Sequence, residues 1–404
     1  MEFDVVPEYA LQNEHISFTI GMPLCQTIAC LQRRYQLFKG IELLYSDKDP
    51  LSTDIILYLS HDGIRLIFDS WSQLLKVIEV MDMTKTSLSY CGHLFSCPTD
   101  LPSIEKINQT FSATHPGVYD SSQRIYTLSW RGLSVLFPTD SNVTPYFAHG
   151  LSSLQFAEDC SLLVSKLIIY HGNSLAEARA PEMPISCYHG NCYCDSVEVL
   201  RCDGRTSGLR VKLKCERFDQ GSYSDCRSET LTKDVYFGDC SQKIAGALGY
   251  PNSIYYKSED KMKIHLPSTE RKRQNEKADY FYNYFTLGMD VLFDATMNTA
   301  KKFILHTNFP GHYDFSIYYR CNFALALGSS SSIVLTAQSK WSEIESFLSC
   351  DEEPSLSEEK LESRKLQQPV VLNRCSSNND SNPFGSTFCF GLQDVIFEVR
   401  RDGQ

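Results

Sequence analysis

The sequence predicts an α+β fold, made mainly of antiparallel sheets in repeated helix–strand–hairpin–strand units with an internally duplicated architecture. Three observations lead to this prediction. Apolar stretches with helical spacing alternate with strand-like runs, Asp-Gly turns join some neighbouring runs, and a strand that runs from glycine to phenylalanine recurs. The copies of that strand lie at 63–68, 132–137, 288–293 and 391–397. We expect the phenylalanine that ends each copy to lie in the core, that is Phe68, Phe137, Phe293 and Phe397.

Each unit is expected to begin with a short helix and to continue with strands. The helices are predicted at 23–31, 103–111, 240–248 and 341–348, with Ser103 and Asp239 placed as N-caps. Hairpins are predicted at 55–69, 124–137, 280–293 and 386–399, and closing strands at 76–80, 166–170 and 302–306. Residues 86–90 are expected to add an edge strand to the first unit. The fourth unit lacks a closing strand before Gln404, so we expect an unpaired edge beside 391–399.

The length of the chain predicts more than one domain. A chain of 404 residues is too long for one ordinary core. We divide it into a first half at 1–172 with two units, a β-rich insertion or extra layer at 173–233, and a second half at 234–404 with two units. Strands are expected at 196–201 and 209–215 within the middle segment.

Composition and charge favour a cytoplasmic protein that does not bind nucleic acid. The net charge is −11, whereas nucleic-acid binding needs a positive surface. The N-terminus lacks the pattern of a signal peptide, and no stretch approaches the roughly 18 apolar residues that cross a bilayer. Without a sign of secretion, the 16 cysteines are expected to be reduced thiols.

Motifs of known enzymes are missing from the sequence. It contains no G-x-S-x-G elbow, no P-loop, no G-x-G-x-x-G and no H-E-x-x-H motif. His149 and His171 each precede a nearby serine, but ordinary loop residues explain this spacing better than a catalytic triad. We therefore expect neither an enzyme nor a bound cofactor, with an unrecognised hydrolase as a remote alternative.

One cysteine-rich segment is a weak candidate for a metal site. Its possible ligands are Cys187, His189, Cys192 and Cys194. Zinc sites usually combine two short-spaced ligand pairs, commonly C-x2-C, and this segment offers C-x4-C and C-x-C instead. Buried or incidental thiols are the favoured interpretation.

A basic run marks a possible contact with lipid. Arg271, Lys272 and Arg273 lie in a polar insert with several lysines around it. Clustered basic residues bind anionic membranes, at about 1 kcal/mol for each residue near the surface. A solvated hairpin insert is the alternative, and we favour it.

Two aromatic turns are candidates for binding a partner. Segments 307–313 and 382–388 combine turn-forming residues with aromatic ones, and the candidate contact residues are Phe309, His312, Tyr313, Phe384 and Phe388. Aromatic side chains on rigid turns bury area at low entropic cost. Packed turns that cap a sheet edge explain the same pattern equally well.

Five segments resemble the phagosome assembly factor family, and they occur in the same order as in that family. They are 18–24, 113–119, 256–265, 305–313 and 382–392. The resemblance spans most of the chain and is weakest at 138–235 and 351–370. The family's cysteine pattern does not include Cys187–Cys194, and its members continue past the position of residue 404.

The resemblance implies a non-enzymatic adaptor in autophagy. It implies a WD-repeat β-propeller partner of the breast carcinoma-amplified sequence type. The pair would be recruited from the cytoplasm to preautophagosomal and phagophore membranes, with the propeller contacting phosphoinositides. The alternative is a protein that acts directly on phosphoinositide membranes in Golgi or endosomal trafficking.

Overall fold

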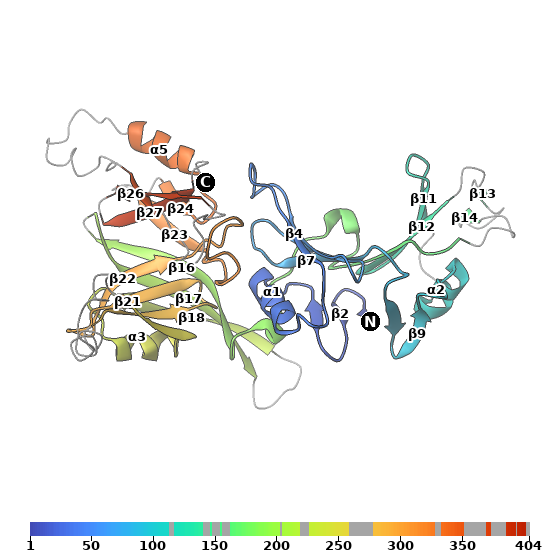
Figure 1. The fold of residues 1–404 in the computed structure, drawn as a ribbon, viewed down its shortest axis with the longest axis horizontal. Coiled ribbons are helices and arrows are strands. Elements are labelled where there is room, and N and C mark those ends of the chain that lie inside the picture. Colours follow the sequence, from blue (N-terminus) through green and yellow to red (C-terminus); the bar gives the residue numbers. More distant parts are fainter. Residues whose placement is uncertain are drawn as a thin grey trace, which may run out of the picture. The chain divides into compact units, whose positions relative to one another are not determined.

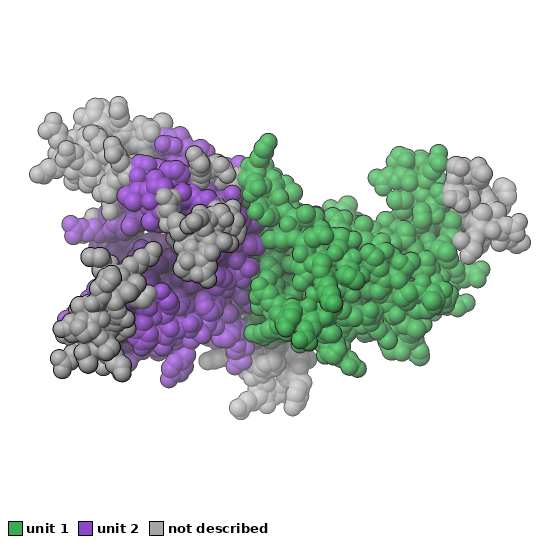
Figure 2. Space-filling view, in the orientation of Figure 1, with its two compact units in different colours: residues 1–188 green, residues 189–404 purple. Residues whose placement is uncertain are grey.

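A computed structural model provides the fold. It describes residues 1–112, 117–139, 146–147, 154–155, 162–202, 204–218, 226–257, 278–327, 333–350, 369–372, 385–392 and 394–400. The chain divides into two compact units, Met1–Tyr188 and His189–Gln404 (Figure 2). Antiparallel sheets dominate both units and the helices are short and few, so the α+β expectation fits only loosely (Figure 1).

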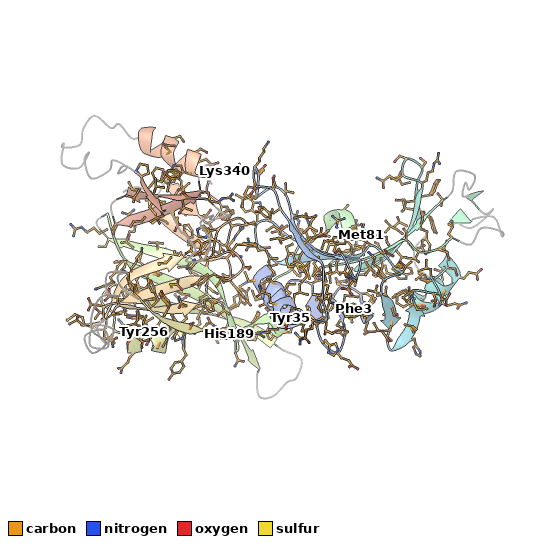
Figure 3. The ribbon with its side chains drawn as sticks, viewed as in Figure 1. Phe3, Tyr35, Met81, His189, Tyr256 and Lys340 are labelled. Atoms are coloured by element: carbon orange, nitrogen blue, oxygen red, sulfur yellow. The ribbon has the colours of Figure 1, made fainter. Side chains whose placement is uncertain are left out.

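The first unit contains a five-stranded sheet in the order β3-β2-β1-β8-β9. Its strands are β1 (Glu2–Val6), β2 (Ala10–Gln12), β3 (Ser17–Thr19), β8 (Ser87–Tyr90) and β9 (His93–Ser96). Strand β8 pairs with β1 in parallel, so the expected edge strand at 86–90 belongs to this sheet instead. Phe3, labelled in Figure 3, is fully buried in β1. The sequence analysis missed β1, β2 and β3.

The first unit also contains an eight-stranded sheet in the order β10-β11-β12-β15-β7-β6-β5-β4 (Figure 1). Its strands are β4 (Ile41–Leu44), β5 (Ile55–Leu59), β6 (Ile64–Phe68), β7 (Leu75–Val80), β10 (Val118–Asp120), β11 (Ile125–Trp130), β12 (Leu133–Pro138) and β15 (Lys166–Tyr170). Strand β15 pairs with both β12 and β7. The predicted second closing strand therefore joins two antiparallel meanders into one sheet.

The helices of the first unit are short. They are α1 (Leu24–Arg33), α2 (Ile104–Phe111), η1 (Leu175–Glu177) and η2 (Ile185–Cys187), and a small hairpin pairs β13 (Tyr146–Phe147) with β14 (Leu154–Gln155). Ser103 caps α2 by accepting a hydrogen bond from the Lys106 backbone, as its position in the sequence predicts.

The described residues of the second unit form three sheets. Five strands follow the order β18-β17-β16-β23-β24: β16 (Cys192–Cys202), β17 (Arg205–Phe218), β18 (Cys226–Tyr236), β23 (Phe323–Leu327) and β24 (Ile333–Thr336). The four-stranded sheet consists of β19 (Ser253–Tyr256), β20 (Tyr280–Tyr284), β21 (Met289–Phe293) and β22 (Ala300–Leu305), in this order. The third sheet is β25 (Val370–Leu372), β26 (Thr387–Leu392) and β27 (Val395–Arg400). The described helices are α3 (Ser241–Leu248) and α5 (Trp341–Cys350).

Two apolar clusters hold the second unit together. Val197 and Val211 of the five-stranded sheet share one cluster with Val291 and Phe293 of the four-stranded sheet. The other cluster joins Trp341 of α5 to residues of β23, β24, β26 and β27. The sheets therefore pack through their apolar faces, and Cys321 of the loop before β23 joins the first cluster.

Two of the four predicted repeats share structural details. In both, a helix precedes a four-stranded meander: α1 before β4–β7, and α3 before β19–β22. The pairing slips by one residue just before Phe68 in one meander and just before Phe293 in the other. These likenesses concern two segments, so the fourfold repeat is not established and stays a prediction.

The core phenylalanines follow the sequence prediction in three cases. Phe68, Phe137 and Phe293 are fully buried, whereas Phe397 is only half-buried against Trp341.

Among the described residues, no helix has the length and apolar character needed to cross a membrane.

We predict that Phe293→Ala costs about 3–5 kcal/mol of unfolding free energy, because it removes a fully buried ring from a closely packed cluster. Denaturant unfolding of the full chain measures this cost. The matched control is Ile396→Ala, which truncates an exposed side chain of β27 and should change the free energy by less than about 1 kcal/mol. Equal effects of the two substitutions would contradict the core assignment.

Candidate functional site

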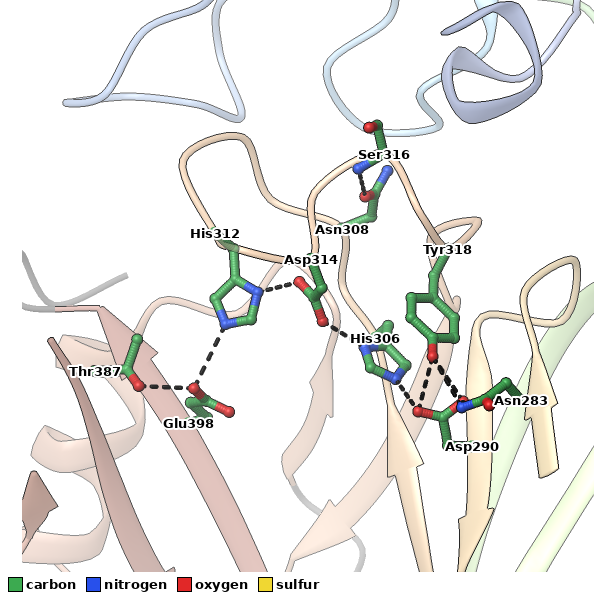
Figure 4. Close-up of polar contacts among 10 residues, drawn as sticks. All are labelled: Asn283, Asp290, His306, Asn308, His312, Asp314, Ser316, Tyr318, Thr387 and Glu398. Atoms are coloured by element: carbon green, nitrogen blue, oxygen red, sulfur yellow. Dashed lines mark hydrogen bonds and ion pairs between the residues drawn. The ribbon is translucent and has the colours of Figure 1, made fainter. Parts of the chain in front are cut away.

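A polar network lies where the loop after β22 meets the strands of the second unit (Figure 4). The loop spans residues 306–322, between the end of β22 and the start of β23. Its anchors are two histidines and a buried aspartate in the loop, together with carboxylates from β21 and β27. This network includes the predicted aromatic turn at 307–313.

His306 bridges two carboxylates at the base of the loop. Its Nε2 lies 2.9 Å from Asp290 Oδ2, and its Nδ1 lies 2.8 Å from Asp314 Oδ2. The ring stacks on Tyr318 with 3.6 Å between the ring centroids. Because a carboxylate accepts at each ring nitrogen, both nitrogens must donate, and His306 is an imidazolium ion.

Asp290 is itself held by neutral donors. The Tyr318 hydroxyl donates to Asp290 Oδ1 over 2.9 Å, and Asn283 Nδ2 donates to the same oxygen over 2.8 Å. Asp290 and Tyr318 are both buried. A buried charge needs hydrogen bonds on all sides, and this arrangement supplies them.

His312 continues the network to the three-stranded sheet. Its Nδ1 contacts Asp314 Oδ1, and its Nε2 lies 3.5 Å from Glu398 Oε1 on β27. Thr387 on β26 donates to the same Glu398 oxygen over 2.7 Å. Asp314 is therefore shared by both histidines, and the loop is tied to two different sheets of the unit.

The network shifts the acid–base equilibria of its members. Burial lowers the pKa of both histidines, but the hydrogen bonds that His306 donates to Asp290 and Asp314 outweigh it and raise the pKa of His306. The bonds that His312 donates to Asp314 and Glu398 likewise raise the pKa of His312 to about 9. Burial raises the pKa of Asp314, but its two histidine partners lower it by more. The shifts favour the imidazolium form of both rings, and a pKa of about 9 makes His312 a cation at neutral pH.

The loop backbone is fixed by several further contacts. Asn308 adopts a positive φ of 51°, and its Oδ1 accepts a hydrogen bond from the Ser316 backbone over 2.8 Å. Gly311 also has a positive φ, and a Cβ there would lie 2.7 Å from Arg400 Nη1. The same nitrogen donates to the Pro310 carbonyl over 2.9 Å. The positive φ therefore favours glycine at 311, and a Cβ there would also displace the end of the Arg400 side chain.

The geometry of the network fits a structural role better than a catalytic one. A general base needs one free imidazole nitrogen next to a nucleophile, and here carboxylates engage both nitrogens of each histidine. The hydroxyls of the network, Thr387 and Tyr318, bond to carboxylates instead of to a histidine. Among the described residues of this loop, the arrangement fixes a shape and presents no activated nucleophile.

The five predicted partner-binding residues have different surroundings. Tyr313 is 43% exposed, as is expected of a contact residue. Phe309 is half-buried, with the Arg320 guanidinium 4.7 Å from its ring centroid. His312 belongs to the network, and Phe388 is half-buried on β26. Phe384 lies outside the described residues. The loop also exposes Ile317, which the sequence analysis did not single out.

The candidate metal ligands Cys187, His189, Cys192 and Cys194 all lie in the described part of the chain. No group of three or more His, Cys, Asp or Glu residues there is placed to hold a metal ion. Cys187 is buried, which raises its pKa to about 11, and burial raises the pKa of Cys194 to about 12. Burial therefore favours the protonated form of these thiols when no metal is bound. The lipid candidates Arg271, Lys272 and Arg273 lie outside the described residues.

Sequence reasoning missed most of the network. The turn signals marked 307–313, but Asp290, His306, Asp314 and Glu398 belong to no recognisable motif. His312 and Glu398 are 86 positions apart in sequence. Only the fold brings them together, so no local pattern could have revealed the pair.

We predict that the protein loses unfolding free energy as the pH rises from 7 to 10. The raised pKa of His312 gives stability that is complete below pH ~6.5 and is lost as the pH passes about 9. The loss should be about 2–3 kcal/mol and should be clearly smaller in His312→Gln, in which only His306 keeps a raised pKa. Chemical denaturation across this pH range measures it, with the exposed His93→Gln as control. Identical pH profiles for wild type and His312→Gln would refute the coupling.

We also predict that Asp314→Asn costs about 3–5 kcal/mol, because it leaves two half-buried imidazolium rings without the buried carboxylate that they share. The matched control is Asp100→Asn, which breaks a surface ion pair with Lys106 and should cost less than about 1 kcal/mol. Thermal or denaturant unfolding compares them. Similar costs for the two variants would show that Asp314 does not organise the loop.

Comparison with known proteins identifies the family. The family model described as phagosome assembly factor 1 matches residues 14–404. A PHAF1 protein of Drosophila melanogaster is 45% identical, over 99% of this chain and 91% of the relative. A PHAF1 protein of Caenorhabditis elegans is 36% identical, over 100% of this chain and 92% of the relative. No solved structure matches the chain. The chain therefore belongs to the phagosome assembly factor 1 family.

Proposed function

We propose that the protein is a non-enzymatic adaptor in autophagosome formation that docks a WD-repeat β-propeller partner of the breast carcinoma-amplified sequence type. Membership in a family described as a phagosome assembly factor supports the process. The relatives carry the name of that family and no enzyme name, which supports the non-enzymatic role. The choice of partner rests on the family resemblance of the sequence.

One structural observation carries the adaptor role: the loop at 306–322 is rigidly held and carries exposed apolar side chains. The network fixes the loop to two sheets, while Tyr313 and Ile317 remain exposed. Exposed apolar side chains on a fixed backbone bind a partner at low entropic cost, since the loop is already ordered. Aromatic anchors of this kind commonly dominate interface energetics.

The proposed location follows from the proposed partner. The protein resides in the cytoplasm and reaches preautophagosomal and phagophore membranes through the propeller, which contacts phosphoinositides. The membrane association of this chain is then indirect.

We predict that Tyr313→Ala combined with Ile317→Ala weakens binding of the propeller by more than about 2 kcal/mol, or roughly 30-fold. Both side chains are exposed, so the fold should be unaffected. The measurement is titration of purified propeller partner with the full chain. Tyr250→Ala is the matched control, since it removes a 92% exposed tyrosine of the same unit. Phe309→Ala should weaken binding through the loss of loop packing under Arg320.

Other results of these binding experiments would favour a different interface or a different function. Full binding by both the double variant and Phe309→Ala would move the interface away from this loop. A propeller that does not bind the wild-type chain would refute the adaptor. Binding to phosphoinositide vesicles without the propeller, abolished by neutralising residues 271–273, would support direct action on membranes instead.

A further inference from the structure

The strand β4 has an exposed apolar edge. It is the last strand of its eight-stranded sheet, with no further neighbour among the strands that the structure describes. Ile41 is 42% exposed and Leu44 is 49% exposed. Natural proteins usually protect such edges with charges, prolines or bulges, because free backbone groups recruit another strand. In β4, four residues long, Glu42 is the one charged side chain, so this edge can accept a partner strand.

The hydrogen bonding of β4 shows which backbone groups are available. The Ser60 backbone nitrogen donates to the Gly40 carbonyl over 3.0 Å, and the pairing continues with Ile41 opposite Leu59. Hydrogen-bonded and non-bonded pairs alternate along an antiparallel ladder. Residues 40, 42 and 44 therefore bond to β5, and the N–H and C=O groups of Ile41 and Leu43 point away from it.

The charges on either side of β4 have opposite signs. Lys39 precedes the strand, with Arg33 and Arg34 at the end of α1 before it, whereas Asp47, Lys48 and Asp49 follow it, two acidic residues and one basic. In an antiparallel pair of two identical strands, the basic end of one copy meets the acidic end of the other. The edge is thus complementary to itself, which favours a second copy of this chain over an unrelated partner.

The outward groups restrict the possible register. Residues 41 and 43 must lie opposite odd-numbered residues of the other copy. A pairing centred on Leu43 places Ile41 opposite Tyr45 and Lys39 opposite Asp47 of the second copy. A pairing centred on Glu42 places two carboxylates directly opposite each other, and like charges in that position are destabilising. The register centred on Leu43 is therefore favoured.

We infer that two copies of this chain associate through antiparallel pairing of their β4 strands, with Leu43 on the two-fold axis. The association joins two eight-stranded sheets edge to edge and brings apolar side chains of the two edges together. Each dimer contains the Lys39–Asp47 contact twice because of the symmetry. The inference does not depend on the proposed adaptor role.

Sedimentation of the purified full chain across the micromolar range tests the inference. The wild type should show a concentration-dependent dimer. Leu43→Lys should abolish it, since it places two ammonium groups at the axis, on an edge position where lysine is compatible with folding. Val118→Lys is the matched control, because β10 forms the opposite edge of the same sheet and Val118 is exposed. It should leave the dimer unchanged.

A charge exchange tests the register without depending on packing. Lys39→Asp alone and Asp47→Lys alone should each weaken the dimer roughly tenfold, because each creates two like-charge contacts. The double variant should restore the wild-type affinity. A wild type that stays monomeric, or a dimer that survives Leu43→Lys, would overturn the inference, and the edge would then be open to a partner of another sequence. A double variant as weak as the single ones would overturn the register.

Discussion

The sharing of Asp314 between His306 and His312 is the interaction on which the candidate site depends. One carboxylate accepts from two imidazolium ions, and each ion reaches a second carboxylate on a different sheet. The loop is thereby attached at β21 and at β27 through charge-assisted hydrogen bonds, which are the stronger kind. Without this aspartate, the two half-buried histidines would lose the carboxylate that they share. The loop conformation, and whatever binds it, follow from that constraint.

Apolar and polar contacts have different roles in the second unit. Val197, Val211, Val291 and Phe293 pack the two larger sheets together, and this apolar cluster sets the positions of the strand ends. The polar network then connects residues at those ends. Because the network contains no free imidazole nitrogen, its chemistry is that of a fixed scaffold. This agrees with membership in a family described as an assembly factor.

Local sequence patterns predicted local structure, but they could not predict which distant segments pair in the fold. The glycine-to-phenylalanine pattern marked β6, β12 and β21, and Ser103 marked the start of α2. The strand β1 was missed because it is stabilised by parallel pairing with β8, far along the chain. The turn at 307–313 was recognised as a candidate, yet Asp290 and Glu398 were not. Nothing in their own neighbourhoods distinguishes them from other acidic residues on strands.

Nuclear magnetic resonance of the imidazole nitrogens in the full chain tests whether Asp314 holds the loop through two protonated histidines. We expect His306 and His312 to carry protons on both nitrogens at neutral pH. We expect His312 to lose a proton only as the pH approaches about 9. Neutral imidazoles at pH 7, or titration of both rings near the ordinary histidine pKa of about 6.5, would contradict it. In that case Asp314 would not hold the loop through two cations.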